Sequence, residues 1–127
     1  MLRVPTALLL HQTPTSRHHD WLIGGPDYLS DPRSRLWTAR VGPGCQVWRK
    51  VGVFDLLQLP HHRRAYLRYQ GPLTGGRGHV KRVDLGQAVI LLWRERRIVL
   101  DVKLEHFTGL IELTRVGVPA WRGRVIG

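Results

Sequence analysis

Residues 88–113 have the sequence AVILLWRERRIVLDVKLEHFTGLIEL. Positions 88–93 are almost wholly apolar, and from 98 to 104 every second residue is isoleucine, leucine or valine. A period of two in a run rich in β-branched residues is typical of a strand with one buried face. The segment therefore predicts consecutive β-strands joined by short turns.

Similar short runs occur along the rest of the chain. We expect strands over 6–10, 20–23, 36–41, 65–70, 80–83, 88–93, 98–104, 110–113 and 121–126. Glycine and proline pairs separate them, and only 51–59 has the pattern of a helical turn or two. We expect mobile loop tips at 25–35 and 42–50. This pattern predicts an all-β fold, a compact β barrel over residues 1–127, with at most one or two short helical turns. The length of 127 residues suits a single domain.

The charge balance is strongly basic. Twenty lysine and arginine residues against nine acidic ones give a formal net charge of +11. All but Lys50, Lys81 and Lys103 are arginine, whose planar fork matches phosphate oxygens. Such a surface attracts polyanions, and nucleic acid is the expected partner. The alternative is that the arginines reflect genome base composition and serve solubility.

Other simple features narrow the class of protein. Cys45 is the single cysteine, which excludes an intrachain disulfide and a zinc site built from several thiolates. No apolar run approaches the roughly 20 residues of a membrane-spanning helix, and the run at 7–10 is too short for a signal peptide. We therefore expect a cytoplasmic protein with no membrane partner.

A first cluster of polar residues lies between 11 and 21. It contains His11, His18, His19 and Asp20. On a strand over 18–22, His18 and Asp20 share one face and His19 points to the other. His11 converges on that pair if its strand is a neighbour. Two histidines and one carboxylate suit Mn, Fe or Zn. The alternative is a chance group of histidines in a polar loop.

A second cluster follows at 59–71, where His62 precedes Tyr66 by four residues. Both side chains can hold a phosphate oxygen, and histidine can donate a proton. We expect an irregular segment over 59–64 that folds His62 back toward Tyr66, and a strand that starts near Ala65. The alternative is a solvated basic strand edge.

The glycine-rich segment 71–80 follows directly. It lacks the lysine and hydroxyl ending of a nucleotide-binding P-loop, and no helix follows it. We expect a tight turn that presents Arg77 at its tip.

These segments together resemble the N-terminal phosphoesterase domain of bacterial DNA ligase D and its stand-alone relatives. That family has a histidine, a short loop and His-Tyr-Asp-Phe-Arg, then His-Pro-x-x-Tyr-x-x-Phe-Glu-Gly before a glycine-rich turn. In this chain His11 precedes His18-His-Asp-Trp21, and His62-Arg-Arg-Ala-Tyr-Leu-Arg-Tyr-Gln-Gly71 keeps the second spacing. The matching segments cover about a third of the chain.

The resemblance implies a β barrel with its site on the inner or concave face. It implies a manganese-dependent enzyme that removes 3′-phosphates and terminal ribonucleosides from DNA ends; zinc is the second candidate metal. His11, His18 and Asp20 would bind the metal, and His62 and Tyr66 the scissile phosphate. The partners would be DNA ends or RNA/DNA primer-templates, with ligase and polymerase as separate proteins in trans.

Three positions depart from the family pattern. Leu22 replaces an arginine that binds phosphate, and Gly24 and Gln70 replace glutamates. A neighbouring arginine could take the place of the missing one, and the candidates are Arg17, Arg40, Arg64 and Arg77. Two alternatives therefore stay open: a non-catalytic nucleic-acid-binding module that keeps the fold, and a phosphoesterase for small nucleotides.

Overall fold

The computed structural model describes all residues from 1 to 127. Its elements are β1 (Leu2–Gln12), β2 (Arg17–Gly24), β3 (Leu36–Val41), the short helices η1 (Cys45–Val47) and α1 (Trp48–Val51), β4 (Val53–His62), the 3₁₀ turn η2 (Arg64–Leu67), β5 (Gly71–Pro72), β6 (His79–Trp93), β7 (Arg97–Lys103), β8 (Thr108–Gly117) and β9 (Ala120–Val125).

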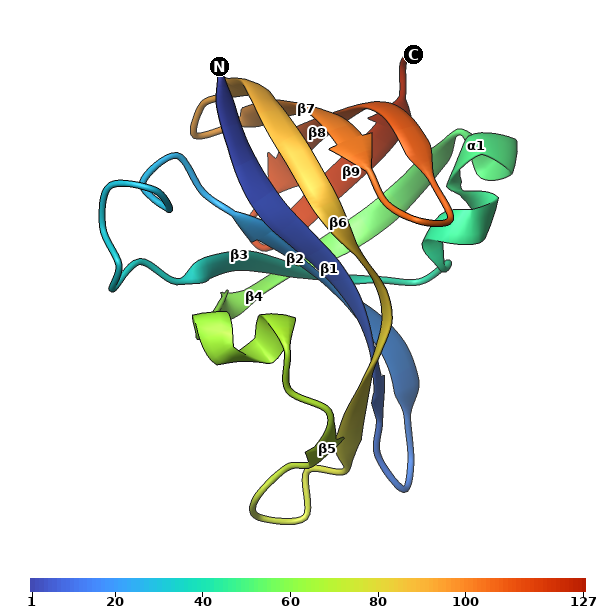
Figure 1. The fold of residues 1–127 in the computed structure, drawn as a ribbon. Helices are drawn as coiled ribbons and strands as arrows, with labels where there is room; N and C mark the ends of the chain where they lie inside the picture. Colours follow the sequence, from blue (N-terminus) through green and yellow to red (C-terminus); the bar gives the residue numbers. More distant parts are fainter.

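The strands form a closed antiparallel barrel. Their order is β1-β2-β3-β4-β9-β8-β7-β6, and β6 pairs again with β1, which closes the sheet. The two-residue β5 adds to the far end of β6. β1, β2 and β6 extend beyond the barrel as a ribbon, and η2 and β5 lie beside that extension (Figure 1). The expected all-β barrel is therefore confirmed, and its helices are as short as predicted.

Two apolar clusters lie on opposite faces of the first strands. The main core fills the barrel and includes Leu8 and Trp21. A smaller cluster of Ala7, Leu9, Leu22, Leu36, Leu67 and Val80 lies on the other face. Because side chains alternate along a strand, Leu9 and Leu22 point away from the main core. The outer face of β1 and β2 is thus covered by η2, which contributes Leu67.

Two expectations about secondary structure are wrong. Residues 65–70 form no strand. Residues 64–67 are the turn η2, and the preceding strand β4 already has β3 on one edge and β9 on the other. Residues 53–62 form the strand β4 rather than a helical turn. Phe54 and Leu56 are buried and alternate with more exposed neighbours, a period that only a strand explains. Pro60 lies inside this strand, but the pairing with β3 shifts there: Leu36 is opposite His62 and Thr38 is opposite Leu59, so the expected irregularity is present as a bulge within 59–62.

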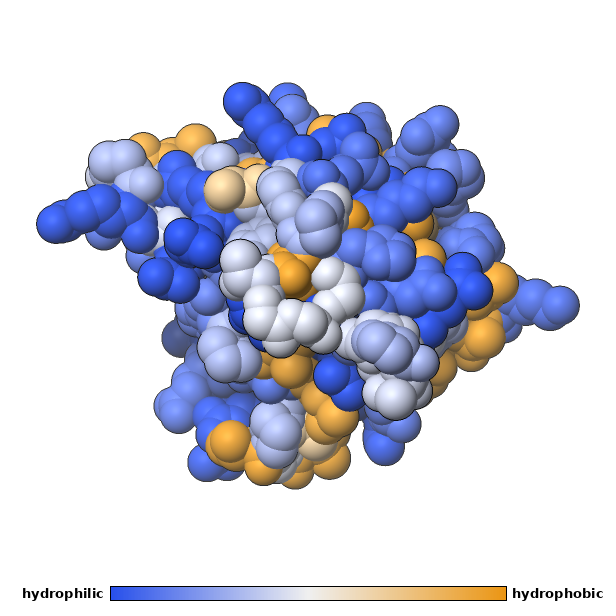
Figure 2. All heavy atoms as spheres, turned by 90° about the horizontal axis from the view of Figure 1, so that it is seen from below, coloured by the Kyte–Doolittle hydropathy of each residue, from blue (hydrophilic) through white to orange (hydrophobic).

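The face of the molecule at the β5 end is mainly polar. Viewed from the end where β5 lies, hydrophilic side chains dominate and apolar ones form small separate patches (Figure 2). No helix combines the length and the apolar character needed to cross a bilayer.

Candidate metal and phosphate site

The β1–β2 hairpin brings the first cluster together. His11 and His18 are directly opposite each other in the strand pair, and Asp20 lies one step further along the same face. The His11 Nδ1 to Asp20 Oδ2 distance is 3.7 Å, and the His18 Nε2 to Asp20 Oδ1 distance is 3.2 Å. Candidate ligand atoms of all three residues lie within 4.8 Å of one another. His19 lies apart, with Nδ1 3.4 Å from the Gly42 carbonyl.

The three residues lie on the outer face of the barrel strands, opposite the main core. They line a cavity of about 400 Å³ that we call the histidine cavity. Its other polar lining residues are Arg35, Arg40, His61, His62, Arg63, Tyr66 and Arg77. The resemblance implies a site on the inner or concave face of the barrel. The structure excludes the inside of the barrel, because these residues lie outside it. The site lies between the hairpin and the covering segment that contains η2 and β5.

A backbone carbonyl fixes the orientation of His11. His11 Nε2 lies 2.8 Å from the carbonyl oxygen of Arg77. A carbonyl only accepts, so Nε2 carries the proton and donates it, which leaves the lone pair on Nδ1, the nitrogen nearer Asp20. Metal-ligating histidines are commonly oriented by such a bond. Gly78 makes this approach possible, because it has φ +82° and a Cβ there would overlap the Gln12 carbonyl.

Two buried polar atoms of the cluster have no hydrogen-bond partner. They are Asp20 Oδ1 and His18 Nδ1. Asp20 Oδ1 is only 3.2 Å from His18 Nε2, yet the two groups are not aligned as a hydrogen bond. Buried carboxylate oxygens are normally satisfied, so this arrangement fits a carboxylate and an imidazole aimed at a shared cation. The donor set, two imidazoles and one carboxylate, suits a divalent transition metal.

Burial also sets the ionisation of the pair. It raises the pKa of Asp20, although the nearby His18, His62, His11 and Arg40 act in the opposite direction. Burial lowers the pKa of His18, and Asp20 only partly offsets this effect. A low pKa favours the neutral imidazole, which is the form that binds metals.

His62 and Tyr66 meet at the rim of the histidine cavity. Their ring centroids are 5.3 Å apart. The geometry differs from the expected one, because His62 ends β4 and the single turn η2 carries Tyr66 back over it. His62 Nδ1 lies 3.0 Å from the Pro60 carbonyl and therefore carries a proton. Nε2 is then an acceptor in the neutral ring and a donor in the imidazolium.

Arginines without acidic partners surround the cavity. Arg35, Arg40 and Arg63 line it and form no ion pair and no side-chain hydrogen bond. Asp20 is the single acidic residue in the lining. Arg77 also lines the cavity, but its guanidinium binds Thr74 in its own turn. The cavity is thus strongly cationic, as expected of a phosphate site.

The other two candidate arginines lie elsewhere. Arg17 is exposed at the start of β2 and does not line the cavity. Arg64 is fully engaged with the β2–β3 loop: it donates to the carbonyls of Tyr28, Asp31 and Ser34 and to the Ser34 hydroxyl. Its guanidinium also lies 3.8 Å from the centre of the Tyr28 ring. Arg64 therefore holds the loop that ends at Arg35 and does not itself face the cavity.

The departures from the family pattern also have positions. Leu22 is fully buried in the smaller apolar cluster under Leu67 and lines no part of the cavity. At Gly24 a Cβ would lie only 3.0 Å from the Cβ of Val4, so a glutamate would have to displace its neighbours. Gln70 accepts a hydrogen bond from the Arg82 backbone at 3.0 Å. Leu22 and Gly24 therefore have structural explanations, whereas the Gln70 contact is one that a glutamate could also make.

Sequence reasoning missed some lining residues and a second polar cluster. Arg35, His61 and Arg63 line the cavity. The positions of His61 and Arg63 next to His62 in the sequence could have suggested these two, but no such signal marks Arg35. Asp84, Glu105 and His106 also bring ligand atoms within 4.8 Å of one another. Asp84 accepts hydrogen bonds from the backbone N–H groups of Glu105 and His106 in the turn between β7 and β8 and from that of Leu85, so this cluster is structural.

No protein-family model matches the chain, and no curated protein matches it significantly. The functional interpretation therefore depends on the residues of the histidine cavity.

Proposed function

We propose that the protein is a metal-dependent phosphoesterase that heals 3′ ends of DNA, removing a 3′-phosphate or a 3′-ribonucleoside in end-joining repair. One observation supports this proposal above the others. His11, His18 and Asp20 converge in a cavity that also holds His62, Tyr66 and unpaired arginines. Metal ligands and phosphate-binding groups thus face the same space.

His11, His18 and Asp20 would hold the ion, with manganese favoured and zinc as the second candidate. When bound, the ion would supply positive charge that polarises the phosphoryl group. Asp20 supplies the negative charge of the ligand set, and the Arg77 carbonyl keeps the lone pair of His11 turned inward. With its lone pair on Nδ1, the neutral ring of His11 has no proton there to donate to Asp20. The two residues can therefore share a cation.

His62, Tyr66 and the arginines would bind the phosphate and the charge that develops on it. Arg35, Arg40 and Arg63 are free to pair with phosphoryl oxygens because no acid neutralises them. In this proposal His62 acts as the imidazolium, in which both ring nitrogens carry a proton. Its Nε2 then has a proton to donate to the leaving oxygen, while Nδ1 keeps its bond to Pro60.

The decisive experiment is incubation with 3′-phosphate and 3′-ribonucleotide primer-templates, with and without Mn²⁺. We expect trimming only with the metal. H62A should lower the rate by about 10²-fold or more, the usual effect of losing a general acid or a positioned donor. H79A is the matched control, because His79 is exposed and lies outside the cavity. Binding to the same ends should weaken steeply with salt.

The alternative is a non-catalytic nucleic-acid-binding module. The burial of Leu22 supports this alternative. The family that the chain resembles has a phosphate-binding arginine at this position, whereas Leu22 is buried and lines no part of the cavity. Tight binding of DNA ends without Mn²⁺-dependent trimming of any end would favour this module and exclude the enzyme.

A further inference from the structure

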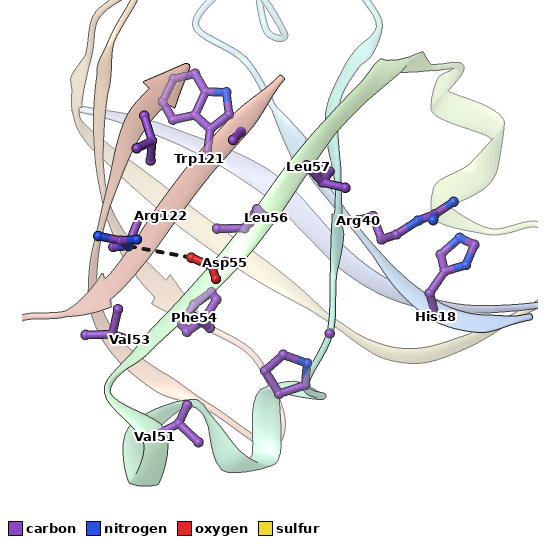
Figure 3. Close-up of a pocket in the computed structure, with 14 residues that line it drawn as sticks. His18, Arg40, Val51, Val53, Phe54, Asp55, Leu56, Leu57, Trp121 and Arg122 are labelled. Carbon is purple, nitrogen blue, oxygen red and sulfur yellow. Dashed lines mark ion pairs between the residues drawn. The ribbon is translucent and has the colours of Figure 1, made fainter. Parts of the chain in front are cut away.

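A second hollow lies on the outer face of β4 and β9, beside α1. Its volume is about 760 Å³, and we call it the apolar groove. Val51, Val53, Leu57 and Val116 line it and keep 49%, 46%, 46% and 59% of their surface exposed. β4 runs along the groove, and Trp121 and Arg122 contribute from β9 (Figure 3). Apolar side chains grouped around one hollow are the usual lining of a ligand site.

The apolar groove is continuous with the histidine cavity. His18 and Arg40 line both. The strand register explains why: Asp20 is opposite Arg40, Arg40 is opposite Leu57, and Leu57 is opposite Ala120. Residues directly opposite one another share a face of the sheet. One row of side chains across the sheet thus runs from the buried carboxylate of Asp20 to Arg40 and then to the apolar Leu57, on the strand next to that of Arg40 (Figure 3).

The charges of the groove favour an anionic occupant at this junction. Arg40 is exposed and has no acidic partner. The single acid in the lining, Asp55, lies 3.5 Å from Arg122, so it is already paired. Proteins that hold unpaired nucleotides combine positive charge for the phosphate with a surface for the base. Here Arg40 supplies the charge, and the aliphatic side chains of Val53 and Leu57 supply the surface.

We propose that the apolar groove binds the 3′-terminal nucleoside of the strand whose phosphate lies in the histidine cavity. Leu57 and Val53 contact the base, and Arg40 contacts the phosphate at the junction. The inference rests on the proposed function for the direction of the strand, but it concerns binding and does not require turnover. It adds to that function a preference for ends that carry a base.

The test compares two labelled oligonucleotides that differ only at the 3′-terminal nucleoside, thymidine in one and an abasic tetrahydrofuran in the other. Both carry a 3′-methylenephosphonate, which cannot be hydrolysed, and affinity is measured by fluorescence anisotropy. We expect the thymidine end to bind several-fold more tightly. L57S should weaken the thymidine end by about fivefold, since it removes apolar contact area, and leave the abasic end unchanged.

Two further variants sharpen the result. L91S is the matched control, because Leu91 is also a half-exposed strand leucine but lines neither hollow. R40A should weaken both ends, because it acts on the phosphate. Equal binding of the two ends by the wild type, or no selective effect of L57S, overturns the proposal; that result is expected if the groove instead docks a protein.

The two proposals fail in different ways. A protein that trims ends with Mn²⁺ but ignores the terminal base keeps the enzyme and loses the groove. A protein that selects the base through Leu57 but never trims keeps the groove and loses the enzyme.

Discussion

Two aspartates, Asp20 and Asp84, are almost completely buried, and each lies beside a histidine, but their surroundings differ. Asp84 accepts hydrogen bonds from the backbone N–H groups of Leu85, Glu105 and His106 and from the Cys45 thiol. His106 Nδ1 also lies 3.1 Å from Asp84 Oδ2. Asp20 has two histidines within 3.7 Å, and its Oδ1 has no hydrogen-bond partner.

The pKa values follow the same division. Burial alone would raise the pKa of Asp84, but the donors from His106, Glu105 and Cys45 reverse this and hold it below its usual value. For Asp20 burial prevails and the pKa is raised. Burial and the bond to Asp84 raise the pKa of Cys45 to about 12, so this thiol stays protonated as a donor. Distances alone group both aspartates with metal ligands; hydrogen-bond satisfaction separates them.

The largest expected effect is that of D20N on function. The change keeps the shape of the side chain and removes the charge of the ligand set. We expect Mn²⁺ binding to disappear in calorimetric titration and end trimming to fall by at least about 10²-fold. The melting temperature should stay equal or rise, because a buried charge with incomplete pairing is costly. Retained Mn²⁺ affinity in D20N would contradict the assignment of Asp20 to metal binding and of Asp84 to structure.

D84N should have the opposite profile. It leaves one acceptor oxygen for several donors, so we expect the free energy of unfolding to fall by about 2–3 kcal/mol in urea denaturation. Mn²⁺ affinity at the histidine cavity should remain as in the wild type. A loss of metal binding by the folded variant would show that the Asp84 cluster also binds the ion.

Low pH should remove the contribution of Asp84 to the free energy of unfolding. Its pKa is lower in the folded state than the ordinary value of 3.8, so its contribution to stability is present above that value. The contribution is lost as the pH falls through the folded pKa. The stability difference between wild type and D84N should therefore be constant near neutral pH and shrink as the pH drops below about 4. A difference that grows on acidification would be the wrong sign.

H106A should have the smallest effect. The ring of His106 is 54% exposed, and its backbone N–H still binds Asp84 after the substitution. We expect a loss of about 0.5 kcal/mol, as for an exposed pair screened by solvent. H79A, which removes an exposed histidine without such a contact, provides the reference. A loss as large as that of D84N would mean that the ring, and not the backbone, organises the turn.

Period-two alternation was enough to predict the barrel and the shared face of His18 and Asp20. It could not place His11, because that depends on the register of the hairpin, where His11 is opposite His18. The same limit explains the error at 53–62. An apolar run is compatible with a helix or a strand, and pairing with β3 and β9 decides the outcome.

The arginines show even more clearly what the sequence alone cannot predict. Arg64 was a candidate phosphate ligand and Arg35 was not, yet Arg64 is occupied by loop carbonyls and Arg35 faces the cavity. Residue type alone does not reveal which guanidinium already has acceptors. That information depends on how the β2–β3 loop folds over η2.

The closure of the barrel has a consequence for the order of folding. Pairing of β1 with β6 and of β4 with β9 joins residues far apart in sequence, such as Leu2 with Ile90 and Val53 with Arg124. Contacts of that kind form slowly, because a long loop must be ordered before they are made. The three candidate metal ligands instead lie on one local hairpin, His11 to Asp20. During folding that hairpin can therefore form while the barrel is still open, so the three side chains can come together before the last strand pairs.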